Sequence, residues 1–154
     1  MEYYEKNKNK PWTEWLIFNR LFKPSIQGFV GLLTTRENSY NIVFKVSKYV
    51  DYLIRHEYIV MKGLKEISLF CPHFCKLIGI IKCQVNSRLE ENSNPLECLS
   101  TKKVLTDVLL SEYISNSKKF SRYVQNPLFP DKIIYSIIKQ VIMGLIIAQR
   151  FKKF

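Results

Sequence analysis

Three residues or residue pairs, in order along the chain, have the chemistry to hold a nucleotide triphosphate. Gly28 and Gly31 form a short glycine turn, Lys45 ends the apolar run Ile-Val-Phe-Lys, and Glu57 lies on an otherwise apolar helical stripe. Glycine lets the backbone approach phosphates without a side-chain clash. A lysine neutralises phosphate charge, and a carboxylate holds that lysine in place. We therefore expect Gly28, Gly31, Lys45 and Glu57 to bind the phosphates of a nucleotide such as ATP.

A second group of candidate residues follows an apolar run later in the chain. The run 104–110 reads as a strand, and it continues into Ser111-Glu112-Tyr113-Ile114. A purine base needs an apolar slot beside an exposed strand edge. We expect Ser111, Glu112 and Ile114 to provide it.

The elements that must position these residues follow from the hydrophobic pattern. The pattern predicts a leader at 1–23, strands within 26–46 around a polar tip at 34–40, and a helix at about 48–67. It then predicts strands at 76–85 and 104–110, a short helix within 115–125 and a long helix at 132–150. The expected fold class is α+β, with a twisted antiparallel sheet of about five strands, one helix packed on it, and two helices after it.

In this order, the residues resemble the first half of the eukaryotic-type Ser/Thr protein kinase family. They are most similar to the divergent kinase-like proteins of large DNA viruses such as iridoviruses. The resemblance implies an N-lobe at 24–114 and the start of a C-lobe at 115–154. It makes Lys45 the strand-three lysine, Glu57 the glutamate of helix αC, and Gly28 and Gly31 the second and third glycines of the Gly-rich loop. Ser111 takes the gatekeeper place, and Glu112 and Ile114 belong to the hinge.

The chain departs from the kinase pattern at several positions. Ile26 stands where the first loop glycine would be, and Lys45 and Glu57 are only 12 residues apart, so that Glu66 is a rival partner. The catalytic loop and the Asp-Phe-Gly motif, which hold Mg²⁺ in the family, have no counterpart before Phe154. We expect weak ATP binding, a role for Mg²⁺ only if a C-lobe is supplied, and no phosphoryl transfer by this chain alone.

A basic surface supports a different class of function. The formal net charge is +11, from 24 basic and 13 acidic residues. Diffuse positive charge favours contact with nucleic acid, and aromatic side chains could stack on bases. The alternative is therefore a nucleic-acid-binding or protein-interaction module without enzymatic activity, in which the aromatic contacts would come from Tyr3, Tyr4, Trp12 and Trp15.

The cysteines suggest weaker alternatives. Cys71, His73, Cys75 and Cys83 could ligate zinc, although structural zinc sites normally use cysteine pairs separated by two to four residues. A catalytic pair of Cys71 or Cys75 with His56 lacks any surrounding signature. The N-terminus has no apolar signal region, so we expect an intracellular protein with free thiols, in host cytoplasm or virion.

The long helix at 132–150 is apolar on several faces. Ile134, Ile138, Ile142 and Leu145 all need cover, which the resemblance would assign to a C-lobe fragment or another kinase. The apolar window 133–148 contains Lys139 and Gln140 and is shorter than the roughly 20 residues of a membrane span. We expect no membrane span.

Overall fold

The protein was analysed as a computed structural model, which describes residues 2–22, 28–47, 51–69, 71–85, 94–96 and 105–152. The chain divides into two compact units. The first comprises residues 1–62 and 77–113, and the second comprises residues 63–76 and 114–154.

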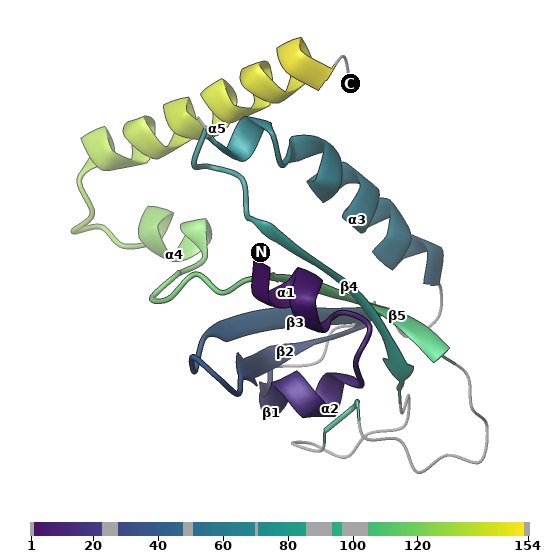
Figure 1. Cartoon of the computed structure of the whole chain (residues 1–154). Coiled ribbons are helices and arrows are strands. Elements are labelled where there is room, and N and C mark those ends of the chain that lie inside the picture. Colours follow the sequence, from purple (N-terminus) through teal and green to yellow (C-terminus); the bar gives the residue numbers. More distant parts are fainter. Residues whose placement is uncertain are drawn as a thin grey trace. The chain divides into compact units, whose positions relative to one another are not determined.

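The first unit is built on one five-stranded sheet. All neighbouring strands are antiparallel, and the spatial order is β1-β2-β3-β5-β4. The strands are β1 (Leu16–Leu21), β2 (Gly28–Thr35), β3 (Asn41–Ser47), β4 (Leu77–Gln84) and β5 (Leu105–Glu112) (Figure 1). The expected α+β class and the antiparallel sheet of about five strands are confirmed.

Alternation along β3 defines two faces of the sheet. Ile42, Phe44 and Val46 are buried, whereas the intervening Val43 and Lys45 are half-buried. Because successive side chains point to opposite faces of a strand, the two sets face opposite ways. We call the side of Phe44 the core face and the side of Lys45 the helix face.

Helix α3 (Asp51–Leu64) packs on the helix face. Its buried residue Ile54 clusters with Leu77 and Leu109 of the sheet, and Tyr58 and Met61 pack against the same cluster. These α3 residues are three or four apart, which places them on one stripe of the helix. The predicted helix at about 48–67 is thus present, although α3 ends at Leu64 and residues 48–50 lie outside the described part.

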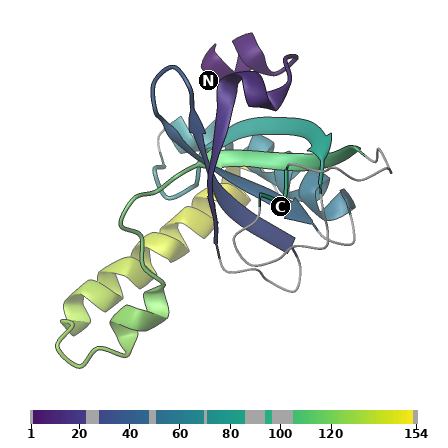
Figure 2. The same cartoon turned by 90° about the horizontal axis from the view of Figure 1, so that it is seen from below.

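Two short helices cover the core face, and both lie within the segment 1–23 that the sequence predicted as a leader. Helices α1 (Glu2–Asn7) and α2 (Trp12–Trp15) precede β1, and Trp15 and Leu16 are buried in the same cluster as Phe44. Figure 2 shows these helices beside the sheet. Residues 16–21 were not recognised as a strand because their alternation is broken by a bulge between Phe18 and Arg20.

The predicted glycine turn is also corrected. Gly28 and Gly31 lie inside the extended strand β2, and neither has a positive φ. A Cβ at Gly28 would collide with the Val46 carbonyl, and one at Gly31 would collide with the Phe44 ring. Both glycines therefore allow close packing of β2 against its neighbours rather than a change of chain direction.

The second unit contains 3-10 helix η1 (Ile67–Leu69), α4 (Phe120–Val124) and α5 (Asp131–Lys152). The predicted helices at 115–125 and 132–150 are both present. Ile134 is half-buried, whereas Ile138, Ile142 and Leu145 are 40%, 50% and 63% exposed within the described part of the chain. Among the described residues, no helix combines the length and apolar character that crossing a membrane requires.

Candidate functional site

The centre of the candidate site is an ion pair between β3 and α3. The Lys45 Nζ donates to Glu57 Oε2 at 2.5 Å. The sequence left Glu57 and Glu66 as rivals for this lysine, and the structure pairs it with Glu57. Glu66 belongs to the second unit.

Strand pairing sets the surroundings of Lys45. Lys45 lies between Val30 of β2 and Leu109 of β5, and residues directly opposite in antiparallel strands share a face. Val43 and Ser111 form the next pair on the helix face. Lys45, Val30, Val43 and Ser111 therefore form a continuous half-buried surface, with the ammonium group at one end.

A cavity adjoins the ion pair. It has a volume of about 380 Å³ and lies between the end of β3 and α3, with Lys45, Ser47, His56, Glu57 and Met61 among its lining residues. This volume falls within the range of roughly 300–1,000 Å³ that small-molecule sites occupy. The cavity has a cation, a carboxylate and a hydroxyl at its wall, and apolar side chains beside them.

The three residues predicted to hold a base have different positions. Ser111 shares the face of Lys45, but Glu112 is paired with Ile42 and so places its side chain on the core face. Glu112 is the last residue of β5, and its backbone groups therefore lie at the end of that strand. Ile114 follows β5, belongs to the second unit and is 55% exposed.

The predicted phosphate-binding glycines are less well placed than the lysine. Gly28 is paired with Ser47, and Gly31 with Phe44, within the regular β2–β3 ladder. Ile26, the departure from the first loop glycine, lies outside the described residues. The ATP-binding role of all seven candidate residues stays a prediction.

A second ion pair fixes α3 to the sheet. Arg55 Nε donates to Asp107 Oδ2 of β5 at 2.5 Å. The Asp107 side chain is 6% exposed, whereas the Lys45 and Glu57 side chains are 41% and 38% exposed. The two pairs thus place α3 over the helix face, and only the Lys45 pair is open to solvent on both partners.

The cysteines do not assemble a metal site within the described ranges. Cys71 and Cys83 are buried, Cys75 is exposed, and no three Cys, His, Asp or Glu side chains converge there. Burial raises the pKa of the Cys83 thiol to about 12, which disfavours the thiolate that metals and electrophiles need. Cys71 and Cys75 belong to the second unit and His56 to the first.

The aromatic residues predicted to contact nucleic acid pack against one another and against the core of the first unit. Trp15 is 2% exposed, and the rings of Tyr3 and Tyr4 meet it edge-on at centroid distances of 5.9 and 6.3 Å. Trp12 packs against the same core cluster. These rings therefore hold α1 and α2 on the sheet.

Sequence reasoning missed several residues of the site. Val30 and Val43 were unremarkable in sequence, and only the strand register brings them beside Lys45. The alternation of β3 was the available signal for Val43, because Val43 lies two residues before Lys45. Ser47, the last residue of β3, lies at the wall of the cavity.

Comparison with known proteins relates the chain to iridescent viruses. It is 32% identical over 117 residues to the uncharacterized protein 038R of Invertebrate iridescent virus 3, a match that covers 73% of this chain and 21% of that protein. It is 27% identical over 151 residues to the uncharacterized protein 098R of Invertebrate iridescent virus 6, covering 77% and 25%. The chain thus spans about a fifth to a quarter of the length of these relatives. No protein-family model matches it. The expected relation to iridovirus proteins is confirmed, and neither relative's name states an activity.

Proposed function

We propose that the first unit is a protein kinase-like nucleotide-binding lobe that binds ATP weakly through Lys45. The observation that carries this proposal is the Lys45–Glu57 ion pair beside a cavity of about 380 Å³. A strand lysine held by a helix glutamate is the arrangement with which kinases bind the α- and β-phosphates. The order of three strands, a helix and two further strands also supports the proposal.

The exposure of the pair suits a ligand-binding role. Ion pairs open to solvent contribute only about 0–1 kcal/mol to stability, so this one does little for the fold. An ammonium that is held in place but still accessible can accept phosphate oxygens as additional partners. Glu57 would orient Lys45, and Lys45 would contact the phosphates.

The base would lie against the apolar part of the same surface. Val30 and Val43 present aliphatic side chains on the face of Lys45, and Ser111 adds a hydroxyl at its far end. We place adenine over these residues and the phosphates toward Lys45. The backbone of Glu112 at the end of β5 would offer the polar edge that distinguishes adenine from other bases.

Two features of the site explain why we expect its affinity for ATP to be low. Within the described ranges, no cluster of three acidic, His or Cys side chains is present to bind Mg²⁺, so a metal that bridges the phosphates would need ligands from elsewhere. The glycines lie in a regular strand ladder and do not form a phosphate-binding turn. Transfer of the γ-phosphate to Ser or Thr is proposed only for a protein that also supplies a base and metal ligands.

The direct test is an ATP titration followed by amide chemical shifts, which detects weak binding. We expect shifts at Val30, Val43 and Ser111 in the native chain, and at least a tenfold loss of affinity in Lys45→Ala. Lys82→Ala is the matched control, because Lys82 is another strand lysine on the helix face. Unchanged ATP binding by Lys45→Ala would show that the lysine assignment is wrong.

Two further measurements separate this function from its alternatives. Purified chain incubated with radiolabelled ATP and Mg²⁺ is expected to transfer no phosphate, and measurable transfer would contradict the proposed limitation to binding. A nucleic-acid module would instead bind oligonucleotides with an affinity that falls steeply with salt and would not respond to ATP. That result would replace the nucleotide-binding proposal.

A further inference from the structure

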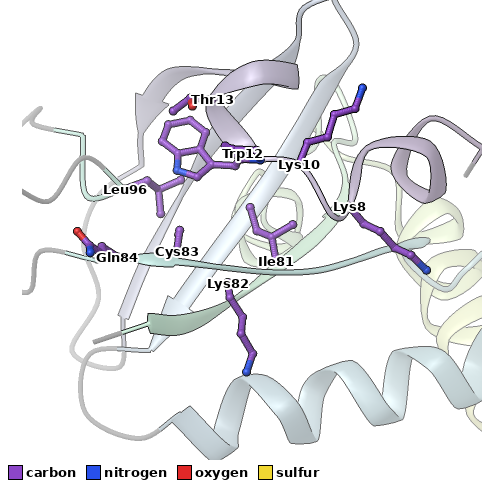
Figure 3. Close-up of a pocket in the computed structure, with 10 residues that line it drawn as sticks. Lys8, Lys10, Trp12, Thr13, Ile81, Lys82, Cys83, Gln84 and Leu96 are labelled. Carbon is purple, nitrogen blue, oxygen red and sulfur yellow. The ribbon is translucent and has the colours of Figure 1, made fainter. Parts of the chain in front are cut away.

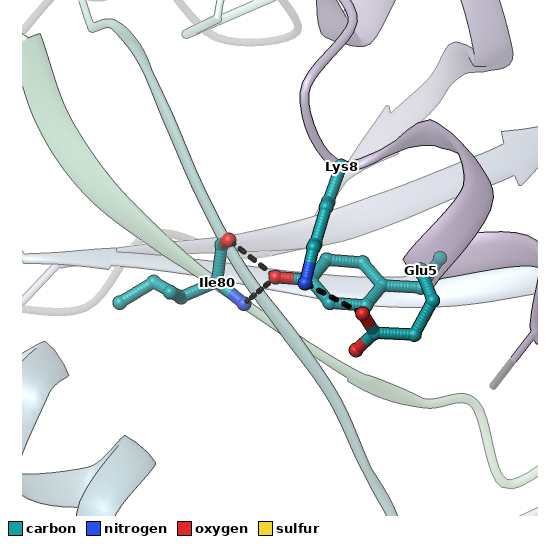
Figure 4. A network of polar contacts seen from close by, with 4 residues as sticks. Glu5, Lys8 and Ile80 are labelled. Atoms are coloured by element: carbon teal, nitrogen blue, oxygen red, sulfur yellow. Dashed lines mark hydrogen bonds and ion pairs between the residues drawn. The ribbon is translucent and has the colours of Figure 1, made fainter.

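The outer edge of β4 has two halves, and helix α1 contacts only the half at Ile80. β4 is an edge strand of the sheet, and edge strands present backbone N–H and C=O groups that no neighbouring strand satisfies. The Tyr4 hydroxyl donates to the Ile80 carbonyl at 2.8 Å and accepts from the Ile80 N–H at 3.2 Å (Figure 4). The Tyr4 ring fills the space that a side chain at Gly79 would occupy. Helix α1 therefore covers the edge at Ile80.

The orientation of Ile80 shows which backbone groups farther along β4 point away from β5. In an antiparallel pair, opposite residues alternate between pointing both backbone groups toward each other and pointing both away. Because Ile80 bonds outward to Tyr4, Lys82 and Gln84 also point their backbone groups away from β5, and the register between Gly79 and Gln84 has no irregularity. No hydrogen bond to these outward groups is found within the described ranges.

A cavity lies beside the uncovered half of the edge. It has a volume of about 390 Å³ and lies between Lys8, Lys10 and Trp12 on one side and the β4 residues 81–84 on the other. Figure 3 shows Trp12 and Leu96 near Cys83, whereas the Lys82 side chain points to the opposite side of the strand. The cavity thus combines an apolar wall with a strand edge whose outward backbone groups at Lys82 and Gln84 have no hydrogen-bond partner in the described part of the chain.

The charged residues that line this cavity are all basic. The Lys8 and Lys10 side chains line it, no Asp or Glu does, and the Lys82 ammonium adds a cation on the opposite face of β4. Lys8 is partly neutralised by Glu5, with an Nζ to Oε2 distance of 2.6 Å, which leaves Lys10 as the main cation on the α2 side. A ligand with carboxylate groups would complement this surface.

We infer that the β4 edge at Lys82 and Gln84 is a docking site for an extended, acidic peptide segment of a partner protein, which adds to the sheet as a sixth strand. Main-chain hydrogen bonds to Lys82 and Gln84 would supply the register. Alternate apolar side chains would lie against Trp12 and Leu96, and the acidic side chains between them would point to the opposite face of the strand, toward Lys82. This site is separate from the Lys45 surface and does not depend on nucleotide binding.

The test uses the full chain and a fluorescent seven-residue peptide that alternates valine or isoleucine with aspartate or glutamate. Two versions of the peptide carry N-methyl groups on one or the other set of alternate amides. The apolar–acidic alternation fixes which set faces β4, because a one-residue slip would exchange the two faces. We expect one methylated version to lose at least tenfold in affinity and the other to bind like its parent. Equal binding of all three peptides would overturn the proposal.

Variants of the chain provide an independent readout. Gln84→Pro removes one outward N–H while sparing the β4–β5 ladder, since proline is tolerated where an edge N–H faces outward. We expect it to weaken binding roughly tenfold, the loss of about one net hydrogen bond, whereas Gln84→Ala, which keeps the N–H, binds normally. Lys82→Glu, which reverses the charge on the face that the acidic side chains would meet, should also weaken binding. Native affinity in Gln84→Pro would contradict strand addition, and if that variant fails to fold, the methylated peptides decide.

Two observations complete the test. Peptide binding should slow hydrogen exchange of the Lys82 and Gln84 amides, and unchanged exchange would argue against the proposal. Sedimentation of the chain without peptide distinguishes another occupant. If the native chain dimerises and Gln84→Pro is monomeric, the edge binds a second copy of this chain, and the partner-peptide proposal fails.

Discussion

The two ion pairs of α3 stand only two residues apart on the helix but have opposite surroundings. Arg55 reaches the buried carboxylate of Asp107, whereas Lys45 and Glu57 meet where both are about 40% exposed. Removing a partner from a buried carboxylate leaves a charge without compensation, which is costly. Removing a partner from an exposed pair exchanges it for water at little cost. The first pair therefore holds α3 in place, and the second is available for a ligand.

We expect the largest change in stability from Arg55→Ala, which removes the partner of the buried carboxylate. Asp107 would be left buried without its guanidinium, and we expect the free energy of unfolding to fall by about 2 kcal/mol, a value reduced because Arg55 itself is largely exposed. Urea unfolding measures it. Lys62→Ala, another exposed basic residue of α3, is the matched control and should change stability by less than about 0.5 kcal/mol.

Lys45→Ala should have a smaller effect on stability than Arg55→Ala. We expect a loss of at most about 1 kcal/mol in the free energy of unfolding, although we propose that the same substitution weakens ATP binding at least tenfold. If Lys45→Ala instead destabilised the protein as much as Arg55→Ala, the two pairs would have the same structural role. The distinction between them would then be wrong.

The smallest expected effect is the change in the coupling energies of the two ion pairs when the salt concentration is raised. Raising NaCl to 1 M shortens the screening length to about 3 Å, which weakens exposed pairs more than buried ones. Double-mutant cycles at low and high salt should show the Lys45–Glu57 coupling energy falling toward zero, from at most about 1 kcal/mol. The Arg55–Asp107 coupling should retain most of its value. Equal loss in both cycles would break the comparison.

Much of the fold was accessible from the sequence because its strongest patterns are local. The alternation of residues 40–46 and the three- and four-residue spacing of Ile54, Tyr58 and Met61 predicted β3 and α3. The pairing of Lys45 with Glu57 was also predicted, since each lies on a recognisable face of its own element.

The features that were missed depend on contacts between distant segments. Strand β1 was hidden by its bulge, and Gly28 and Gly31 were misread because their need for glycine comes from Val46 and Phe44 across the sheet. Arg55–Asp107 joins residues 52 positions apart and has no sequence signature. Likewise, Val30 became a candidate only through its register with Lys45.

The Tyr4–Ile80 contact has a consequence for the order of folding. It joins residues 76 positions apart, whereas the β1–β2 and β2–β3 pairings connect neighbouring strands. Closing a long loop costs more chain entropy than closing a short one, so we expect α1 to dock after the sheet has formed. Tyr4→Phe should accordingly accelerate unfolding while leaving the folding rate nearly unchanged. During synthesis, the β4 edge at Ile80 would then stay uncovered until α1 docks, which would make it a point where a newly made chain is exposed to aggregation.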